Sequence, residues 1–171
     1  MDWPEARDHV PRMHRLVFTL ARRAPPLLRL LLSGMGSVGR GDREKELGQM
    51  KRRVHPADHA VFSEPGRLEA FAEMMHEAMK QGIRGAAWDM TLYVRDFGFA
   101  PEDARIPVTW FHGALDLNAP VQLARRVTRS WPGARLVTFP EDAHLSTLCR
   151  HFQEIAAALA PPCRESSRRS P

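Results

Sequence analysis

The chain has 171 residues, enough for one modest domain, and its 43% hydrophobic content excludes wholesale disorder. The formal net charge is +5, but the basic residues are scattered along the chain, so we expect no nucleic-acid partner. Cys149 and Cys163 fit neither a disulfide framework nor a metal site, and no run has the pattern of a signal peptide or a membrane span, so we expect a cytoplasmic protein.

Helical periodicity dominates the first half of the chain. Apolar residues recur at helical spacing over residues 11–33, and Pro25-Pro26 predicts a joint between two short helices. Asp42 is a candidate cap for the next helix. Ser63 is a candidate cap for another helix, which ends at Gly82. We therefore expect an all-helical region up to the loop near residue 99.

From Pro107 the pattern changes to strands that alternate with helices. Val108–His112 and Leu136–Phe139 are short apolar runs bounded by turn residues, which is typical of buried strands. A helix is predicted between them over Pro120–Trp131, and a closing helix over residues 143–159. This order predicts two parallel strands joined by a helical crossover.

A polar loop follows each predicted strand, and each loop carries one residue suited to acid–base chemistry. Asp116 lies just beyond the first strand and His144 just beyond the second. The carboxyl ends of parallel strands share one rim of a sheet, so these two side chains can meet there. A carboxylate that fixes the tautomer of an imidazole leaves the other ring nitrogen free to act as a general base. Asp116 and His144 are therefore the candidate catalytic residues.

The sequence around these loops resembles a known family. Residues 106–121, IPVTWFHGALDLNAPV, look like the acid-bearing segment of α/β-hydrolase fold proteins. Residues 132–144 look like the His-bearing segment of the same family. Residues 81–89 and 95–99 are similar to the junction between cap and core in one bacterial branch of these hydrolases. The resemblance spans most of the chain.

The resemblance implies an α/β protein with a partial α/β-hydrolase fold, in which an N-terminal helical cap precedes a two-strand parallel βαβα piece. The cap would occupy residues 1–100 and the core segment residues 101–160, and we expect a disordered tail over residues 161–171. The family's chain order of nucleophile, acid and base implies that Asp116 is the triad acid and His144 the base. It also implies a small-molecule substrate, with no cofactor, no metal and no membrane partner.

Other interpretations of these loops remain open. Asp116 could form a turn and His144 could cap the final helix, although their pairing and order favour the catalytic interpretation. We expect Glu141 and Asp142 to be solvated loop charges and His112 to pack beside the strand end. Separately, the sequence has Ala143 where Gly commonly precedes the His of the family.

The nucleophile-bearing turn of the family has no clear counterpart here. That turn reads Gly-x-Ser-x-Gly between a strand and a helix, so that backbone N–H groups can form an oxyanion hole. The nearest match, Met35-Gly36-Ser37-Val38-Gly39, begins with Met and follows a helical stretch that contains Arg29. A central parallel strand would be uniformly apolar. We therefore expect Ser37 to lie in a loop and not to be the nucleophile.

These observations predict a fragment of a serine hydrolase that cleaves an ester, amide or related bond through an acyl-enzyme and is inactive alone. One alternative is a non-catalytic ligand-binding or regulatory remnant. Another is one half of a split hydrolase, completed by a complementary N-terminal segment. Two strands with their helices cannot bury both faces of a parallel sheet or cover its edges, so we also expect exposed apolar surface and an unpaired strand edge.

Overall fold

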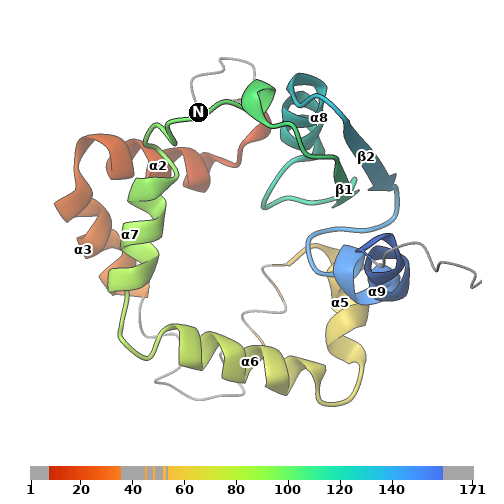
Figure 1. Ribbon diagram of the computed structural model, residues 1–171. Helices are drawn as coiled ribbons and strands as arrows, with labels where there is room; N and C mark the ends of the chain where they lie inside the picture. Colours follow the sequence, from red (N-terminus) through yellow and green to blue (C-terminus); the bar gives the residue numbers. More distant parts are fainter. Residues whose placement is uncertain (1–7, 36–44, 46–47, 49–51, 53, 160–171) are drawn as a thin grey trace, which may run out of the picture.

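The computed structural model describes residues 8–35, 45, 48, 52 and 54–159 (Figure 1). The first part of the chain contributes helices α2 (Arg12–Arg23), α3 (Pro25–Met35), α5 (Pro56–Ser63), α6 (Arg67–Ala78) and α7 (Arg84–Leu92), then the 3-10 turn η1 (Pro101–Asp103). The second part contributes β1 (Val108–Gly113), α8 (Val121–Ser130), β2 (Ala134–Phe139) and α9 (Ser146–Leu159). The expected division near residue 100 falls just before η1 and stays a prediction.

The elements lie around an open ring (Figure 1). On one side α2, α3 and α7 pack together, and on the other lie the two strands with α8 and α9. Helix α6 spans one edge of the ring between α7 and α5, and α5 packs against α9. The first and second parts of the chain therefore meet at the contact between α5 and α9, and also where η1 packs against α8.

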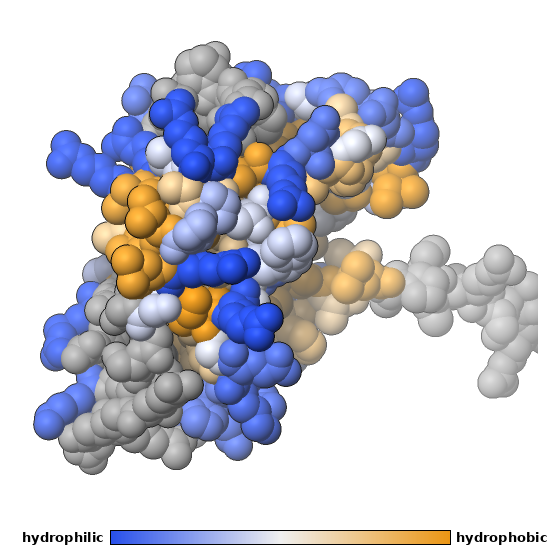
Figure 2. Space-filling view, turned by 90° about the vertical axis from the view of Figure 1, so that its left-hand side faces the viewer, coloured by the Kyte–Doolittle hydropathy of each residue, from blue (hydrophilic) through white to orange (hydrophobic). Residues whose placement is uncertain are grey.

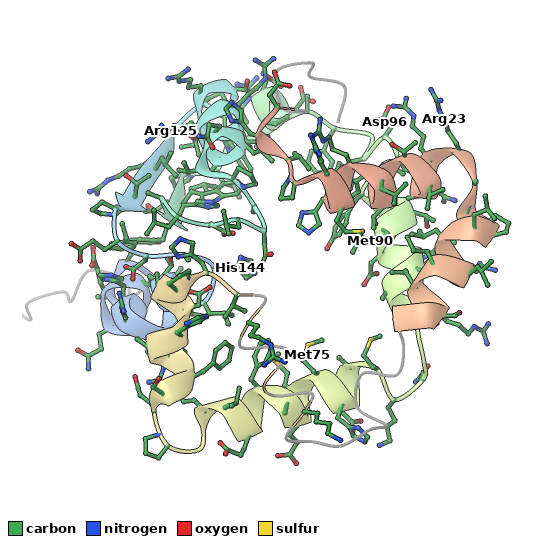
Figure 3. All side chains as sticks on the ribbon, turned by 180° about the vertical axis from the view of Figure 1, so that it is seen from behind. Arg23, Met75, Met90, Asp96, Arg125 and His144 are labelled. Atoms are coloured by element: carbon green, nitrogen blue, oxygen red, sulfur yellow. The ribbon has the colours of Figure 1, made fainter. Side chains whose placement is uncertain are left out.

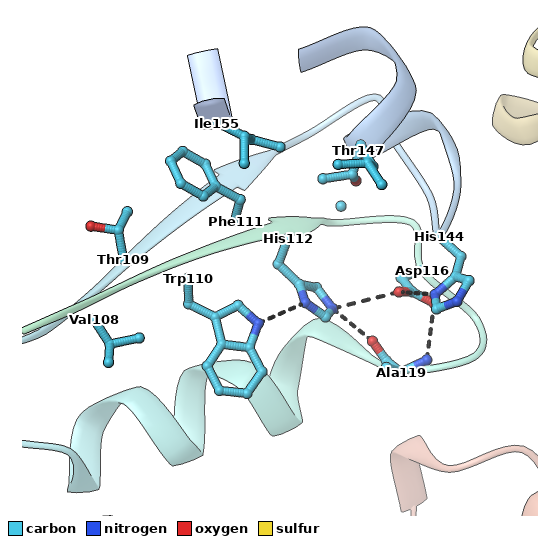
Figure 4. A pocket seen from close by; sticks show the side chains of 12 residues that line it. Val108, Thr109, Trp110, Phe111, His112, Asp116, Ala119, His144, Thr147 and Ile155 are labelled. Carbon is cyan, nitrogen blue, oxygen red and sulfur yellow. Dashed lines mark hydrogen bonds and ion pairs between the residues drawn. The ribbon is translucent and has the colours of Figure 1, made fainter. Parts of the chain in front are cut away.

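Strands β1 and β2 form a parallel pair, in register from Val108 opposite Ala134 to Gly113 opposite Phe139. This pairing confirms the predicted parallel strands. Helix α8 packs against both strands and α9 packs against β1, on opposite sides of the sheet (Figure 4). Each strand is paired on one side within the described residues, so the expected unpaired edge is present.

The predicted joint at Pro25 is confirmed, because α2 ends at Arg23 and α3 begins at Pro25. A buried cluster holds the two helices against α7 and is formed by Val17, Ala21 and Leu28. Proline is favourable at the first position of a helix, where its missing N–H has no intrahelical partner, so Pro25 starts α3 without cost.

Several predicted helix boundaries are wrong. Ser63 is the last residue of α5 and no cap, since its hydroxyl donates to the carbonyl of His59 (3.0 Å). Helix α5 starts early because Pro56 begins it and the Nδ1 atom of His55 accepts from the N–H of Ala57 (3.1 Å). The next helix, α6, begins after Gly66, whose φ of 76° reverses the chain.

The ends of three helices also differ from expectation. Helix α6 ends at Ala78, before the expected Gly82, and α3 reaches Met35. Helix α9 begins at Ser146, three residues later than Ala143, and kinks at His151, where φ is −110° and ψ is 20°. Asp42 and the expected tail over residues 161–171 lie outside the described residues.

Large apolar side chains remain exposed in the described part of the chain, as expected. Leu30 on α3 is 71% exposed and Phe152 on α9 is 63% exposed. Figure 2, which faces the side where α3 lies, shows hydrophobic patches between hydrophilic residues. None of the described helices combines the length and apolar character that crossing a bilayer requires.

Candidate active site

The loops after β1 and β2 are fastened to each other by backbone hydrogen bonds. The N–H of Ala114 donates to the carbonyl of Phe139 (2.9 Å), and the N–H of Leu115 donates to the carbonyl of Asp142 (2.9 Å). These bonds continue the pairing of the strands into the loops. Residues on the two loops therefore have fixed relative positions.

Asp116 is held in a tight turn of the first loop. Its Oδ1 atom accepts from the N–H of Asn118 (2.8 Å) and from the N–H of Ala119 (2.9 Å). The residue is only 7% exposed, and these two bonds offset the cost of burying its carboxylate. The turn expected for Asp116 is therefore present, and it aims the second carboxylate oxygen, Oδ2, at the neighbouring loop.

The structure brings Asp116 and His144 together. The Nδ1 atom of His144 lies 2.9 Å from Oδ2 of Asp116 (Figure 4). An ionised carboxylate only accepts hydrogen bonds, so the proton of the neutral imidazole lies on Nδ1. Nε2 is then the acceptor. The His144 side chain is 47% exposed and faces the open centre of the ring (Figure 3), so Nε2 is accessible to another group.

The pair shifts both pKa values. Burial raises the pKa of Asp116, but the hydrogen bond from His144, the two N–H donors of the turn and the charge of His144 together lower it below its ordinary value. For His144, the hydrogen bond to Asp116 is the largest effect and raises the pKa, burial opposes it, and the charges of Asp116 and Asp58 add to the increase. The arrangement therefore stabilises an imidazolium beside a carboxylate.

His112 supports the turn from within the sheet. It packs beside the strand end, as expected, and is 8% exposed. The indole Nε1 of Trp110 donates to Nδ1 of His112 (3.3 Å), so Nε2 carries the ring proton and donates to the carbonyl of Ala119 (2.7 Å). The chain of bonds from Trp110 to Ala119 holds the loop in which Asp116 lies (Figure 4).

The prediction that Asp142 is a solvated loop charge is wrong, while Glu141 is exposed as expected. Asp142 is 3% exposed and bonds to Nη1 of Arg150 and to Nε2 of His151, both at 2.8 Å. Helix α9 folds back over the loop, which brings two side chains from eight and nine residues later onto this carboxylate. The ring of His151 also stacks on Phe139, with centroids 3.7 Å apart.

Ala143 fits the loop without strain. It is fully buried, and no residue other than glycine has a positive φ in the described ranges. The loop of Ala143 packs closely against Gly113 on the neighbouring loop. A Cβ at Gly113 would overlap the carbonyls of Asp142 and Ala143, so the glycine at this position makes room for the Ala143 loop. The family's glycine before the His is therefore unnecessary for this backbone.

Asp58 is a feature of the site that the sequence did not reveal. It lies in the first turn of α5, is 2% exposed, and accepts from the N–H groups of Leu145 and Ser146 and from the Ser146 hydroxyl. An acidic residue soon after Pro56 reads as an ordinary helix start, and its partners lie 87 and 88 residues away. The only local signal was that a proline, Pro56, begins α5.

A groove of about 440 Å³ runs along β1 to the Asp116 and His144 pair (Figure 4). Its lining is mostly apolar and includes Val108, Phe111 and Leu148. The groove follows β1, which, like β2, has only one neighbouring strand within the described residues. It therefore combines an open strand edge with the candidate acid and base.

The described residues include no evident nucleophile at this pair. Ser37 lies outside them. Ser146, two residues after His144, is fully buried, and its Oγ donates to Asp58 (2.8 Å) and accepts from the N–H of Ala143 (2.7 Å). Its buried hydroxyl is therefore occupied by these two hydrogen bonds and is not accessible to a substrate. Within the same residues, no group of three or more His, Cys, Asp or Glu side chains is placed to hold a metal ion.

Neither a family model nor a curated protein matches the sequence. Among solved structures, the chain is similar to a thermophilic esterase from Thermogutta terrifontis, determined with malate bound, with a TM-score of 0.51 and 19% sequence identity. The similarity covers 92% of this chain and 51% of the esterase, so the chain spans about half the length of that protein. At this identity the likeness concerns the fold, which is hydrolase-like and mixes helices with two parallel strands.

Proposed function

We propose that this chain is the cap and C-terminal part of an α/β-hydrolase that cleaves an ester, amide or related bond in a small molecule. The observation that carries the proposal is the 2.9 Å contact between Asp116 and His144 on the loops after two neighbouring parallel strands. The buried carboxylate fixes one ring nitrogen and leaves the other accessible, which is the arrangement that a triad requires of its acid and base. The esterase-like fold supports the same assignment.

In the proposed reaction a serine hydroxyl attacks the carbonyl carbon of the substrate while Nε2 of His144 takes the hydroxyl proton. The bond to the leaving alcohol or amine then breaks, and Nε2 returns the proton to it. A water molecule repeats the sequence on the acyl-enzyme and releases the acid and the free serine. Asp116 stabilises the imidazolium that forms in both steps, in keeping with the raised pKa of His144 that their hydrogen bond causes.

The proposal assigns the serine to a complementary hydrolase segment that completes the sheet. The groove beside β1 supports this assignment, because its lining is mostly apolar and it ends at the acid and base. Natural edge strands are commonly protected by charged side chains. β2 carries the exposed Arg135, whereas β1 carries no Asp, Glu, Lys or Arg. A further parallel strand on β1 would bring its carboxyl end to the same rim as Asp116 and His144.

Labelling with a serine-directed fluorophosphonate tests the proposal. We expect no labelling of the 171-residue chain alone, with Ser37→Ala as the matched control. Joining the chain to the coding sequence directly upstream of it in its genome should give a protein that is labelled and hydrolyses 4-nitrophenyl esters. His144→Gln should lower kcat about 10³-fold or more, since it removes the base.

Two results would contradict this assignment. The first is stoichiometric labelling of the chain alone that Ser37→Ala abolishes. The second is hydrolysis by the joined protein that His144→Gln leaves unchanged.

A further inference from the structure

Asp58 is a buried carboxylate whose contacts all lie next to His144. One oxygen, Oδ1, accepts from the N–H of Leu145 (3.1 Å), the N–H of Ser146 (2.8 Å) and the Oγ of Ser146 (2.8 Å). A buried carboxylate is costly unless hydrogen bonds compensate it, so these three bonds strongly favour one position of the loop.

The two residues that flank His144 are both fixed through this carboxylate. Leu145, on one side, donates to it directly. Ala143, on the other side, donates to the Oγ of Ser146 (2.7 Å), and that hydroxyl in turn donates to Asp58. The backbone on each side of the imidazole is therefore tied to α5, an element of the helical region that lies far away in the sequence.

We propose that Asp58 is a positioning residue for His144, which holds the loop so that the imidazole meets Asp116 and presents Nε2 to the reacting atoms. That His144 is a catalytic base rests on the proposed function. That Asp58 holds the loop of His144 rests on the three hydrogen bonds alone. The helical region would thus act on the base itself, in addition to covering the site.

A purely structural alternative is that Asp58 only caps α9. The N–H groups of Leu145 and Ser146 are among the unpaired donors at the start of that helix, and a carboxylate there is favourable in any protein. The two interpretations differ in what loss of the three bonds does to His144: a positioning role predicts that the imidazole moves away from Asp116, and a mere cap does not. The carboxylates that act on its imidazole are Asp116 and Asp58, and the charge of each raises its pKa.

The first test compares Asp58→Asn with Asp58→Ala in the full chain. The asparagine carbonyl can still accept the three bonds, so this variant removes the charge and keeps the tether, whereas alanine removes both. The pKa of His144 follows from the pH dependence of its modification by diethyl pyrocarbonate, measured by peptide mass spectrometry in dilute solution. His9, which is exposed and lies on another part of the chain, reports on the reagent.

We expect Asp58→Asn to lower the pKa of His144 and to leave the profile of His9 unchanged. Asp58→Ala should lower the pKa further, because a displaced loop also weakens the bond to Asp116. Asp89→Asn, an exposed substitution on α7 with the same change of charge, should leave His144 unchanged. A pKa of His144 that falls no further in Asp58→Ala than in Asp58→Asn would overturn the inference, because loss of the tether would then leave the contact with Asp116 unchanged. If Asp58→Ala fails to fold, Ser146→Ala takes its place, since it breaks the link to Ala143 and keeps the charge of Asp58; a pKa of His144 equal to that of the wild type in Ser146→Ala would then overturn the inference.

The second test uses the joined, active protein. Asp58→Ala should lower kcat about 10²-fold with little change in KM, since a small misplacement of a base has that effect. Activity that needs His144 but is insensitive to both Asp58 variants would overturn the inference and leave the proposed function intact. Absence of activity, together with a pKa of His144 that is lower in Asp58→Ala than in Asp58→Asn, would reject the proposed function and leave the positioning role intact.

Discussion

The hydrogen bond between Asp116 and His144 joins a buried carboxylate to a half-exposed imidazole. Because the imidazole is reached by solvent, its charge is partly screened, and the bond contributes less to stability than the pKa shifts alone would suggest. The turn N–H groups of Asn118 and Ala119 hold the carboxylate whether or not His144 is charged. The carboxylate of Asp116 is thus a hydrogen-bond acceptor in a fixed position, and its partner, His144, changes its charge with pH.

The titration makes the contribution of the pair depend on pH in a definite direction. The raised pKa of His144 means that its stabilising effect is full below the ordinary value of 6.5 and is lost as the pH rises through the folded-state pKa. The lowered pKa of Asp116 means that its effect is present above the ordinary value of 3.8 and is lost as the pH falls through its folded-state pKa. The pair therefore stabilises the fold most between these two ordinary values.

We predict that His144→Gln destabilises the chain more near about pH 5.5 than near about pH 8.5. Urea unfolding at the two pH values measures this difference. His9→Gln, the same substitution at an exposed position, is the matched control. Equal destabilisation by His144→Gln at both pH values would contradict the pKa shifts on which the prediction rests.

Gly113 is the residue that permits the two loops to approach. A Cβ at this position would lie 2.5 Å from the carbonyl oxygen of Asp142 and 2.6 Å from Oγ1 of Thr147, and it would overlap the carbonyl of Ala143. Two of these three atoms belong to the backbone and cannot rotate away. Any side chain at residue 113 must therefore push the His144 loop away from the Asp116 loop.

We predict that Gly113→Ala lowers the free energy of unfolding by about 1–3 kcal/mol, the usual cost of overpacking. Gly85→Ala is the matched control, because Gly85 lies in α7 with nothing within 4 Å of its Cβ position. There the substitution should be neutral or stabilise by about 0.5–1 kcal/mol, since alanine favours a helix. The prediction fails if urea unfolding shows equal effects for the two variants.

At the scale of elements, α9 is fixed by two buried carboxylates from different parts of the chain. Asp58 on α5 accepts the first N–H groups of the helix, and Asp142 in the preceding loop binds side chains one to two turns further along. The second contact includes His151, where the helix kinks. The kink thus falls at a residue that binds Asp142, while the start of the helix, next to His144, is bound to Asp58.

The elements that could be predicted from the sequence are those determined by local pattern. Strand β1, strand β2 and helix α8 are short apolar or amphipathic runs with clear turn residues, and Pro25 marks the joint between α2 and α3. The roles of Asp58 and Asp142 could not be predicted, because each depends on how α9 packs in three dimensions. Asp58 binds the start of α9 from a distant part of the chain, and Asp142 binds side chains further along the same helix. The prediction that Ser63 caps a helix is wrong because α5 already begins at Pro56 and Ser63 is its last residue. Nothing in the local sequence separates a capping serine from a terminal one.

The molecule as a whole is an open ring with a sheet of two described strands (Figure 1). One helix packs on each face of this sheet, α8 against both strands and α9 against β1, and the unpaired backbone groups lie along its edges. The edge of β1 adjoins the apolar groove, and large side chains such as Phe152 are exposed nearby on α9. Exposed apolar surface next to an unpaired strand favours association with another strand.

We predict that the isolated chain associates through the edge of β1 and that a charge placed there opposes it. Thr109 is exposed on β1 and lies opposite Arg135, so Thr109→Glu adds a charge in the groove while keeping a favourable cross-strand pair. Sedimentation velocity over a range of concentrations should show association of the wild type and a shift toward monomer in this variant. Thr138→Glu, the same change at an exposed position on β2, should associate like the wild type.

The same two substitutions in the joined protein test the pairing edge more directly. If a strand of the added segment already occupies β1, the same Thr109→Glu substitution should destabilise the joined protein and lower its esterase activity, whereas Thr138→Glu should do neither. A wild-type chain that stays monomeric at every concentration, or equal effects of the two substitutions, would count against β1 as the pairing edge. Edge protection predicts that only the strand without a charged side chain accepts a neighbour. Such results would mean that Arg135 on β2, and the absence of a charged residue from β1, have a cause other than strand pairing.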